Sequence, residues 1–267
     1  MTATALSDEK TALSDNKTAL SVNLNKIALL RNSREGNYPN VVEHAKTCIA
    51  AGADGITIHP RPDQRHIRVE DVANLHQLLQ NQADIEYNIE GNPFANAMGS
   101  YPGFMELVEQ HIPEQCTLVP DSNDQLTSDH GFNLSQSGDK LVPIIERLQT
   151  LGCRISLFMD PDIEQIKLAK DIGADRIELY TGPFAAAYAA NSDNFDELFR
   201  SYYDAAVAAQ ELGLGVNAGH DLNLENLGKF REIPNILEVS IGHALTVDSI
   251  AMGMGNAVSA YKNLCIK

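Results

Sequence analysis

The sequence predicts a single α/β domain over residues 18–267, folded as a (β/α)8 or TIM barrel. From about residue 20 onward one unit recurs: an amphipathic helix, a Gly and a short β-branched strand. AGADGITI at 51–58 and IGADRIEL at 172–179 are near copies of this joint. Eight such strands fit the chain, and eight parallel strands with right-handed helical crossovers close into a barrel.

The strands are expected at regular intervals, with helices between them. Their expected ranges are 20–24, 55–59, 85–89, 116–119, 155–159, 176–180, 215–218 and 237–241. Apolar residues at helical spacing predict a helix over 163–172 and a final helix with one apolar face from Val247 to Tyr261. A doubly wound open sheet is the alternative. It would normally show a Gly-rich turn after the first strand, and SVNLNKIALLRN at 21–32 has no Gly.

The N-terminus repeats itself before the first strand. TALSDEK at 4–10 is followed by TALSDNK at 11–17. Two copies with one Leu each cannot bury a coiled-coil seam. Residues 1–17 are therefore expected to be a polar extension outside the barrel.

Charge and cysteine usage exclude several classes of protein. The formal net charge is -16 and no Lys/Arg-rich run exists, which argues against binding to nucleic acid or to acidic membranes. The four cysteines are far apart, without a CxxC pair, so no zinc module or disulfide framework is indicated. No apolar run approaches 18 residues and no leader is recognisable. We expect a cytoplasmic protein.

Ionisable side chains are expected at the carboxyl ends of the strands, where barrel enzymes gather their reactive groups. Four are candidate catalytic residues: His59, Glu86, Glu178 and His220. Any one of them alone could equally be structural. Together they favour catalysis, because unpaired carboxylates in a barrel mouth are costly to bury.

Basic residues cluster after the second strand, in ITIHPRPDQRHI at 56–67. Arg61, Arg65 and His66 predict an anion site, since guanidinium groups bind phosphate in a bidentate manner, and Arg31 and Arg34 add to this field. The alternative is a set of solvated charges paired with loop carboxylates such as Asp63.

A second anion site is predicted in VNAGHD at 216–221 and SIGHALTVDS at 240–249. Loops after the last two strands of a barrel often cradle phosphate, with Gly and a helix N-terminus. Alternatively, Gly219 and Gly242 only turn the chain.

Metal and Schiff-base chemistry have weaker support. The first strand ends with Asn23 and Asn25, where barrel metallohydrolases usually offer His-x-His. Asp160 and Asp162 fit a helix N-cap better than a Mg²⁺ site. Only Lys26 lies close enough to a strand end to form a Schiff base. We expect no metal.

The sequence resembles the pyridoxine 5′-phosphate synthase family. The motifs that carry the resemblance are VNLNKIALLRNSR at 22–34, AGADGITIHPRPDQRHI at 51–67, IEYNIEGN at 85–92, LVPD at 118–121, ISLFMD at 155–160, IELYTG at 177–182, VNAGHDL at 216–222 and IGHA at 241–244. They follow the family order over essentially everything after residue 20.

The resemblance implies an enzyme that is an octamer of barrels and needs no cofactor. Such an enzyme would condense 3-amino-2-oxopropyl phosphate with 1-deoxy-D-xylulose 5-phosphate into pyridoxine 5′-phosphate. It implies general-base roles for His59 and Glu86, a general-acid role for His220, and stabilisation of a cationic transition state by Glu178. The implied substrate-binding residues are Asn23, Asn25, Lys26, Arg34, Arg61, His66, Thr127, Asp221, Gly242 and His243.

The chain departs from the family at three of these positions. Asn25 and Lys26 replace the usual Asp-His, and Asp221 replaces the usual Gly after the acid His. Two alternatives therefore stay open: another sugar-phosphate barrel enzyme that uses Lys26, or a phosphate-ligand-binding paralogue without turnover. The long polar stretch 121–140 is expected to be a lid.

Overall fold

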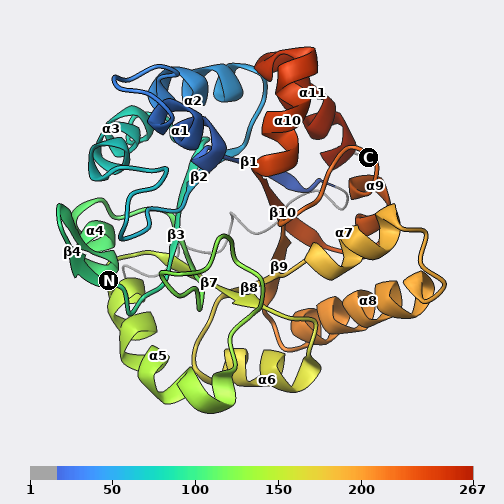
Figure 1. Ribbon diagram of the computed structural model, residues 1–267. Helices are drawn as coiled ribbons and strands as arrows, with labels where there is room; N and C mark the ends of the chain where they lie inside the picture. Colours follow the sequence, from blue (N-terminus) through green and yellow to red (C-terminus); the bar gives the residue numbers. More distant parts are fainter. Residues whose placement is uncertain (1–16, 267) are drawn as a thin grey trace, which may run out of the picture.

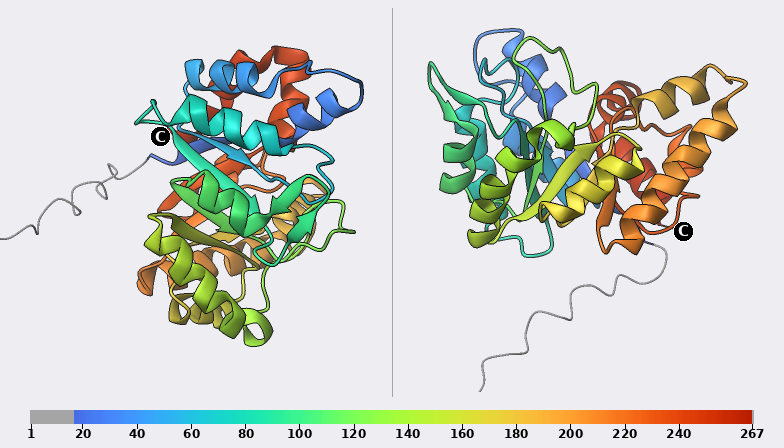
Figure 2. Two further views of the ribbon diagram at one scale, coloured as in Figure 1. Left: turned by 90° about the vertical axis from the view of Figure 1, so that its left-hand side faces the viewer. Right: turned by 90° about the horizontal axis from the view of Figure 1, so that it is seen from below.

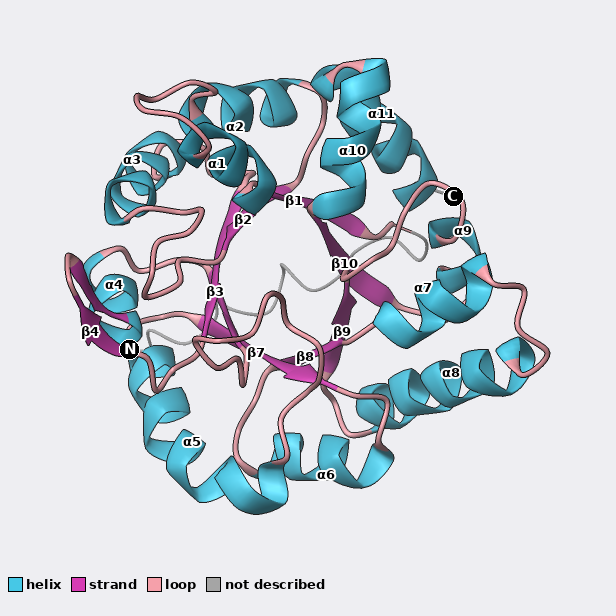
Figure 3. Cartoon of the chain, viewed as in Figure 1, coloured by secondary structure: helices cyan, strands magenta, loops and turns pink. Residues whose placement is uncertain are grey.

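The computed structural model describes residues 17–266 and confirms the predicted barrel. Eight parallel strands close in the order β1-β10-β9-β8-β7-β6-β3-β2, and a ring of helices surrounds them (Figure 3). The barrel strands are β1 Ala19–Asn23, β2 Gly55–Ile58, β3 Glu86–Gly91, β6 Gln115–Leu118, β7 Arg154–Met159, β8 Arg176–Leu179, β9 Gly215–Ala218 and β10 Ile236–Ile241. All eight predicted strands are present, within two residues of their expected ends. The proposed extension 1–17 lies, apart from Lys17, outside the described residues.

The helices follow the strands in the expected alternation, and Figure 2 shows them against the outside of the sheet. They are α1 Asn25–Asn32, α2 Val41–Ala50, α3 Val69–Leu79, α4 Phe104–Gln110, α5 Leu134–Thr150, α6 Ile163–Asp171, α7 Gly182–Ala189, α8 Phe195–Glu211, α9 Leu227–Phe230, α10 His243–Met252 and α11 Met254–Cys265. Their apolar faces and the outward side chains of the strands form one continuous core. No helix within residues 17–266 is long and apolar enough to cross a bilayer.

Two features differ from the sequence prediction. A small antiparallel hairpin, β4 Asn96–Met98 and β5 Tyr101–Gly103, is inserted between β3 and α4. The predicted final helix is two helices, because Gly253 has a positive φ of 78° and ends α10. The predicted single apolar face is therefore wrong: Val247 and Ile250 are exposed, whereas Tyr261 of α11 is buried.

Polar side chains fill the inside of the barrel. Along β3, Tyr87 and Ile89 are buried on the helix side, and the Tyr87 hydroxyl donates to a carbonyl of α3. Asn88 points the other way and lies between Thr57 and Thr117, with which it shares hydrogen bonds. Because side chains alternate along a strand, Glu86 and Glu90 also face the lumen, one at each end.

Candidate active site

Ionisable groups line a cavity of about 350 Å³ at the carboxyl ends of the strands. His59, Glu178 and His220 all line it, as expected. So do most of the predicted substrate-binding residues: Asn23, Asn25, Lys26, Arg61, His66, Thr127, Asp221, Gly242 and His243. The barrel thus brings together twelve of the fourteen predicted residues, and the exceptions are Glu86 and Arg34.

The expected position of Glu86 at the mouth is wrong. Glu86 is the first residue of β3, so its side chain lies at the opposite end of the barrel, where it forms an ion pair with Arg154 at the start of β7. Arg154 also donates to Gln115, and Gln115 bonds to Glu238. This network closes the bottom of the barrel, far from the cavity.

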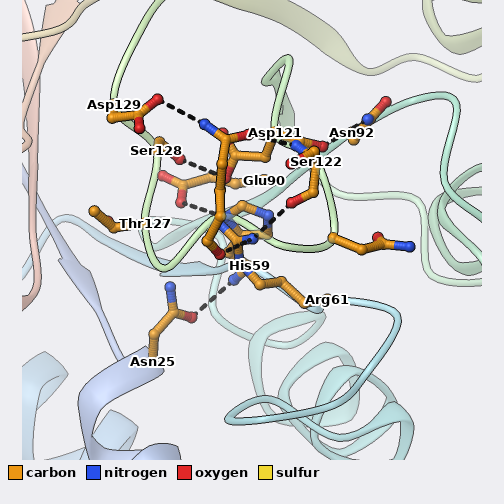
Figure 4. Close-up of polar contacts among 12 residues, drawn as sticks. Asn25, His59, Arg61, Glu90, Asn92, Asp121, Ser122, Thr127, Ser128 and Asp129 are labelled. Atoms are coloured by element: carbon orange, nitrogen blue, oxygen red, sulfur yellow. Dashed lines mark hydrogen bonds and ion pairs between the residues drawn. The ribbon is translucent and has the colours of Figure 1, made fainter.

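Glu90 occupies the place in the mouth that Glu86 was expected to hold. It is the fifth residue of β3 and lines the cavity (Figure 4). One carboxylate oxygen lies 4.0 Å from Nδ1 of His59 and accepts from the Asn23 amide at 3.3 Å. The strand continues to Gly91, two residues beyond its predicted end. The sequence Gly91-Asn92-Pro93, whose residues disfavour a strand, was the signal that could have placed the strand end after Glu90 and thus Glu90 at the mouth.

Two carboxyl groups in the cavity favour their protonated forms. Burial, together with the nearby charges of Asp121 and Glu238, raises the pKa of Glu90 to about 8. Burial also raises the pKa of Glu178 well above its usual value, and the charge of Glu90 adds to this effect. At neutral pH both groups therefore hold protons that a reaction could take up or release.

The two histidines after β2 are neutral. Burial lowers the pKa of His59 well below its usual value, and the positive charge of Arg61 lowers it further. Burial and Arg61 likewise lower the pKa of His66 to about 3. Nδ1 of His66 accepts from the backbone N–H of Ile67, so its proton is on Nε2. The backbone N–H of His59 donates to Asn25 at 2.9 Å, which ties the end of β2 to the start of α1.

His220 projects from the loop after β9 toward the cavity. Its Nε2 lies 2.9 Å from the hydroxyl of Thr127, and its ring packs edge-on against Tyr180 at 5.4 Å between centroids. Gly219 lets this loop approach β10 closely, because a Cβ there would lie 2.1 Å from the carbonyl oxygen of Ser240. Gly219 is thus required because a side chain would not fit against β10, and not because the turn needs a positive φ.

Much of the basic cluster after β2 is already paired within the protein. Arg61 is buried and forms an ion pair with Asp121, and Arg31 is fully buried against Asp71. Arg65 pairs with Asp63, as the alternative interpretation predicted. Arg34 is exposed in the turn after α1 and does not line the cavity.

The other anion site has a more open arrangement. Gly242 and His243 line the cavity, and His243 is the first residue of α10, whose N-terminus faces the same space. Lys26 reaches the cavity from α1. Among residues 17–266 no carboxylate lies within ion-pair distance of the Lys26 amine. This side of the cavity can therefore receive a phosphate without breaking an internal ion pair.

The long polar segment crosses the mouth as a loop (green in Figure 1). It is shorter than expected, because residues 134–140 form the start of α5. Asp121 anchors its first residues: it pairs with Arg61 and accepts from Ser128 at 2.8 Å. Its tip is held by Arg65, which donates to the carbonyls of Asn123 and Gln125, both at 2.8 Å.

Metal binding finds no support in the described part of the chain. No group of three or more His, Cys, Asp or Glu side chains in residues 17–266 is arranged to hold an ion. Asp162 caps α6 by accepting from the N–H groups of Glu164 and Gln165, as its sequence context favoured. The expectation that no metal or cofactor is needed stays a prediction.

Comparisons with known proteins identify relatives of this chain. The family model described as pyridoxal phosphate biosynthesis protein PdxJ matches residues 20–267. A pyridoxine 5′-phosphate synthase of Xanthomonas campestris pv. campestris strain B100 is 52% identical over 239 residues, which cover 89% of this chain and 92% of that protein. A protein of the same name from Xylella fastidiosa strain 9a5c is 48% identical, over 90% of this chain and 92% of its own length.

Solved structures confirm the fold alone. A 3-keto-L-gulonate-6-phosphate decarboxylase from Vibrio cholerae superimposes with a TM-score of 0.61 at 12% identity, covering 93% of this chain and 97% of that one. A tryptophan synthase α-subunit from Pyrococcus furiosus gives 0.56 at 12% identity, covering 94% of this chain and 96% of that one.

Proposed function

Because the chain belongs to the family of the pyridoxal phosphate biosynthesis protein PdxJ, we propose that it is a pyridoxine 5′-phosphate synthase. Its substrates are 3-amino-2-oxopropyl phosphate and 1-deoxy-D-xylulose 5-phosphate. Its products are pyridoxine 5′-phosphate, inorganic phosphate and water. One observation carries the proposal: four titratable side chains from separate strand ends, His59, Glu90, Glu178 and His220, line one cavity.

These groups suit a reaction with several proton transfers. Imine formation, loss of phosphate and ring closure each move protons at carbon, nitrogen or oxygen. Neutral His59 is an acceptor at physiological pH. Glu90 takes the general-base role first assigned to Glu86, since its pKa of about 8 lies near the working pH.

The pair of protonated carboxyls responds to the charge of the substrate. A cationic imine in the cavity lowers the pKa of both Glu90 and Glu178, because an opposite charge favours the ionised carboxylate. Both carboxyl groups thus release their protons when the cation forms. Glu178 then stabilises that cation, the role the resemblance implied for it.

Two phosphate groups need two positions. The first is formed by Lys26, Gly242 and His243 at the start of α10, where backbone N–H groups and the helix dipole favour an anion. The second is formed by Arg65 and His66, which also line the cavity. Asn23 and Thr127 also line the cavity, and we assign them to contacts with the rest of the substrates.

The protein acts in the cytoplasm, without metal or organic cofactor, and as a homo-oligomer, an octamer if it follows the family. The exposed face of two neighbouring helices supports self-association. Leu29 and Leu30 of α1 and Val247 and Ile250 of α10 are between 43% and 85% exposed, and the two helices are in contact. Large exposed apolar side chains on adjoining helices are a feature of interfaces between copies.

The direct test is product formation. The purified protein is incubated with both substrates, and pyridoxine 5′-phosphate is sought by mass and absorbance, with each substrate omitted in turn as a control. The proposal expects product only when both are present. Binding of the sugar phosphate by calorimetry without any product would instead favour a non-catalytic paralogue. A borohydride-trapped adduct on Lys26 would favour an aldolase.

A further inference from the structure

Asp221 stands beside His220 in a conformation that few side chains adopt. Its φ is 65°, in the left-handed region that favours Gly. The turn around it is fixed, because the Leu222 N–H donates to the Gly219 carbonyl and the Asn226 side chain donates to the carbonyl of Asp221. A residue other than Gly at a positive φ suggests that its side chain has a function.

The Asp221 carboxylate contacts the His220 ring. Its Oδ2 lies 3.0 Å from Nδ1, while Nε2 on the far side of the ring lies 2.9 Å from the Thr127 hydroxyl. The hydrogen bond from His220 keeps the pKa of Asp221 below its usual value, so the group is a carboxylate at neutral pH and can only accept. The proton of a neutral His220 must therefore lie on Nδ1, which leaves Nε2 to accept from Thr127 and to face the cavity.

We propose that Asp221 is a positioning residue for His220: it holds the proton on Nδ1, presents Nε2 to the substrate, and stabilises the imidazolium form. The effect of Asp221 on catalysis rests on the proposed function, whereas its effect on the His220 ring does not. The resemblance had assigned Asp221 to substrate binding, whereas the geometry directs its carboxylate to the imidazole.

The consequence for acid catalysis has a defined sign. A carboxylate beside Nδ1 favours the imidazolium, so its removal should weaken His220 as a proton donor. Other charged or titratable groups share this surrounding and stay in place in every variant: Tyr180 after β8, Lys26 of α1, His243 of α10, Asp129 and His130 of the mouth loop, Asp160 after β7, and His59, Glu90 and Glu178 across the cavity.

Two variants separate this role from a structural one. Asp221→Asn keeps the shape and tolerates the left-handed backbone, whereas Asp221→Gly removes the side chain and relieves the backbone. Both should fold, and the Gly variant should melt at the same temperature as the wild type or higher. Glu225→Gln is the matched control, because it removes one exposed negative charge four residues further along the same loop.

The experiment is an NMR titration of histidines labelled with ¹⁵N in the free protein, with the His220 signals assigned from a His220→Gln variant. We expect the Nδ1–H form in the wild type and in Glu225→Gln. The Nδ1–H preference should weaken in Asp221→Asn, whose amide can accept or donate, and should be lost in Asp221→Gly. Identical tautomers in the wild type and both Asp221 variants would overturn the proposal.

The readout needs no substrate, so it remains valid if the chain makes no pyridoxine 5′-phosphate. Where the product does form, kcat of Asp221→Asn should fall about tenfold or more at alkaline pH. A wild-type kcat in Asp221→Asn at alkaline pH would contradict the role of Asp221 in catalysis.

Discussion

Glu86 and Glu90 lie on the same face of β3, yet only Glu90 reaches the cavity. Side chains four residues apart share a face in a strand, so alternation alone predicts that both enter the lumen but not which end each occupies. That choice depends on where the strand ends, and strand ends are less certain than strands. Placing the end at residue 89 moved the expected catalytic carboxylate to the wrong end of the barrel.

Replacing Glu90 should change how stability depends on pH. The carboxyl has a pKa of about 8 in the folded protein and an ordinary value of 4.5 when unfolded. Between these pH values the folded state binds more protons than the unfolded state, so the free energy of unfolding falls as pH rises. Glu90→Gln cannot ionise and escapes this loss, which amounts to up to about 5 kcal/mol at roughly 1.4 kcal/mol per pKa unit.

Urea unfolding of the wild type and Glu90→Gln at pH 5 and pH 8 measures this effect. The variant should gain stability relative to the wild type as pH rises. An equal difference in unfolding free energy at the two pH values would mean that Glu90 does not titrate in this window.

At the scale of elements, the loops after β9 and β6 build the mouth by close approach and by hydrogen bonds. The sequence predicted both loops from their Gly and polar content, because these signals are local. It could not predict that Arg61 and Arg31 are paired with Asp121 and Asp71, since those partners are 60 and 40 residues away. Pairing over such distances depends on tertiary structure.

Close packing of the loop after β9 predicts a contrast between two glycines. Gly219→Ala should destabilise the protein by about 1–3 kcal/mol, because the new Cβ must displace the backbone of β10. Gly228→Ala is the control: nothing lies within 4 Å of its Cβ in α9, so it should be neutral or stabilise by about 0.5–1 kcal/mol. Chemical denaturation compares the two, and equal effects would show that Gly219 is not held against Ser240.

The loop over the mouth should behave as a lid that Arg65 keeps closed. Adding 1-deoxy-D-xylulose 5-phosphate should slow hydrogen exchange across 121–133 in the wild type. Arg65→Ala loses two donated hydrogen bonds, each contributing about 1 kcal/mol, so exchange at 122–128 should rise about tenfold or more.

Arg200→Ala is the control for that experiment, since Arg200 forms an exposed pair with Asp204 on α8. It should leave the loop unchanged. If saturating sugar phosphate has no effect on hydrogen exchange, the loop is not a gate and Thr127 is not a substrate-binding residue.

At the scale of the whole molecule, the barrel followed from sequence because its repeating unit is local and its closure follows from handedness. Helix, Gly and strand recur with enough regularity to fix both the count and the order of the strands. The β4 and β5 hairpin was missed because its strands have three residues each and no alternating pattern. The exposed apolar surface of α10 was missed because the break at Gly253 was read as part of one helix.

We propose that the mouth of this barrel, with Glu90 as its base, forms pyridoxine 5′-phosphate. The decisive measurement is product from both substrates with the wild type, Glu90→Gln and Glu86→Gln under one set of conditions. We expect product from the wild type and a loss of about 10²- to 10⁴-fold in kcat for Glu90→Gln. Folded Glu86→Gln should keep near wild-type kcat, because its ion pair with Arg154 lies at the other end of the barrel. An active Glu90→Gln beside an inactive, folded Glu86→Gln, or no product from the wild type, would contradict this assignment.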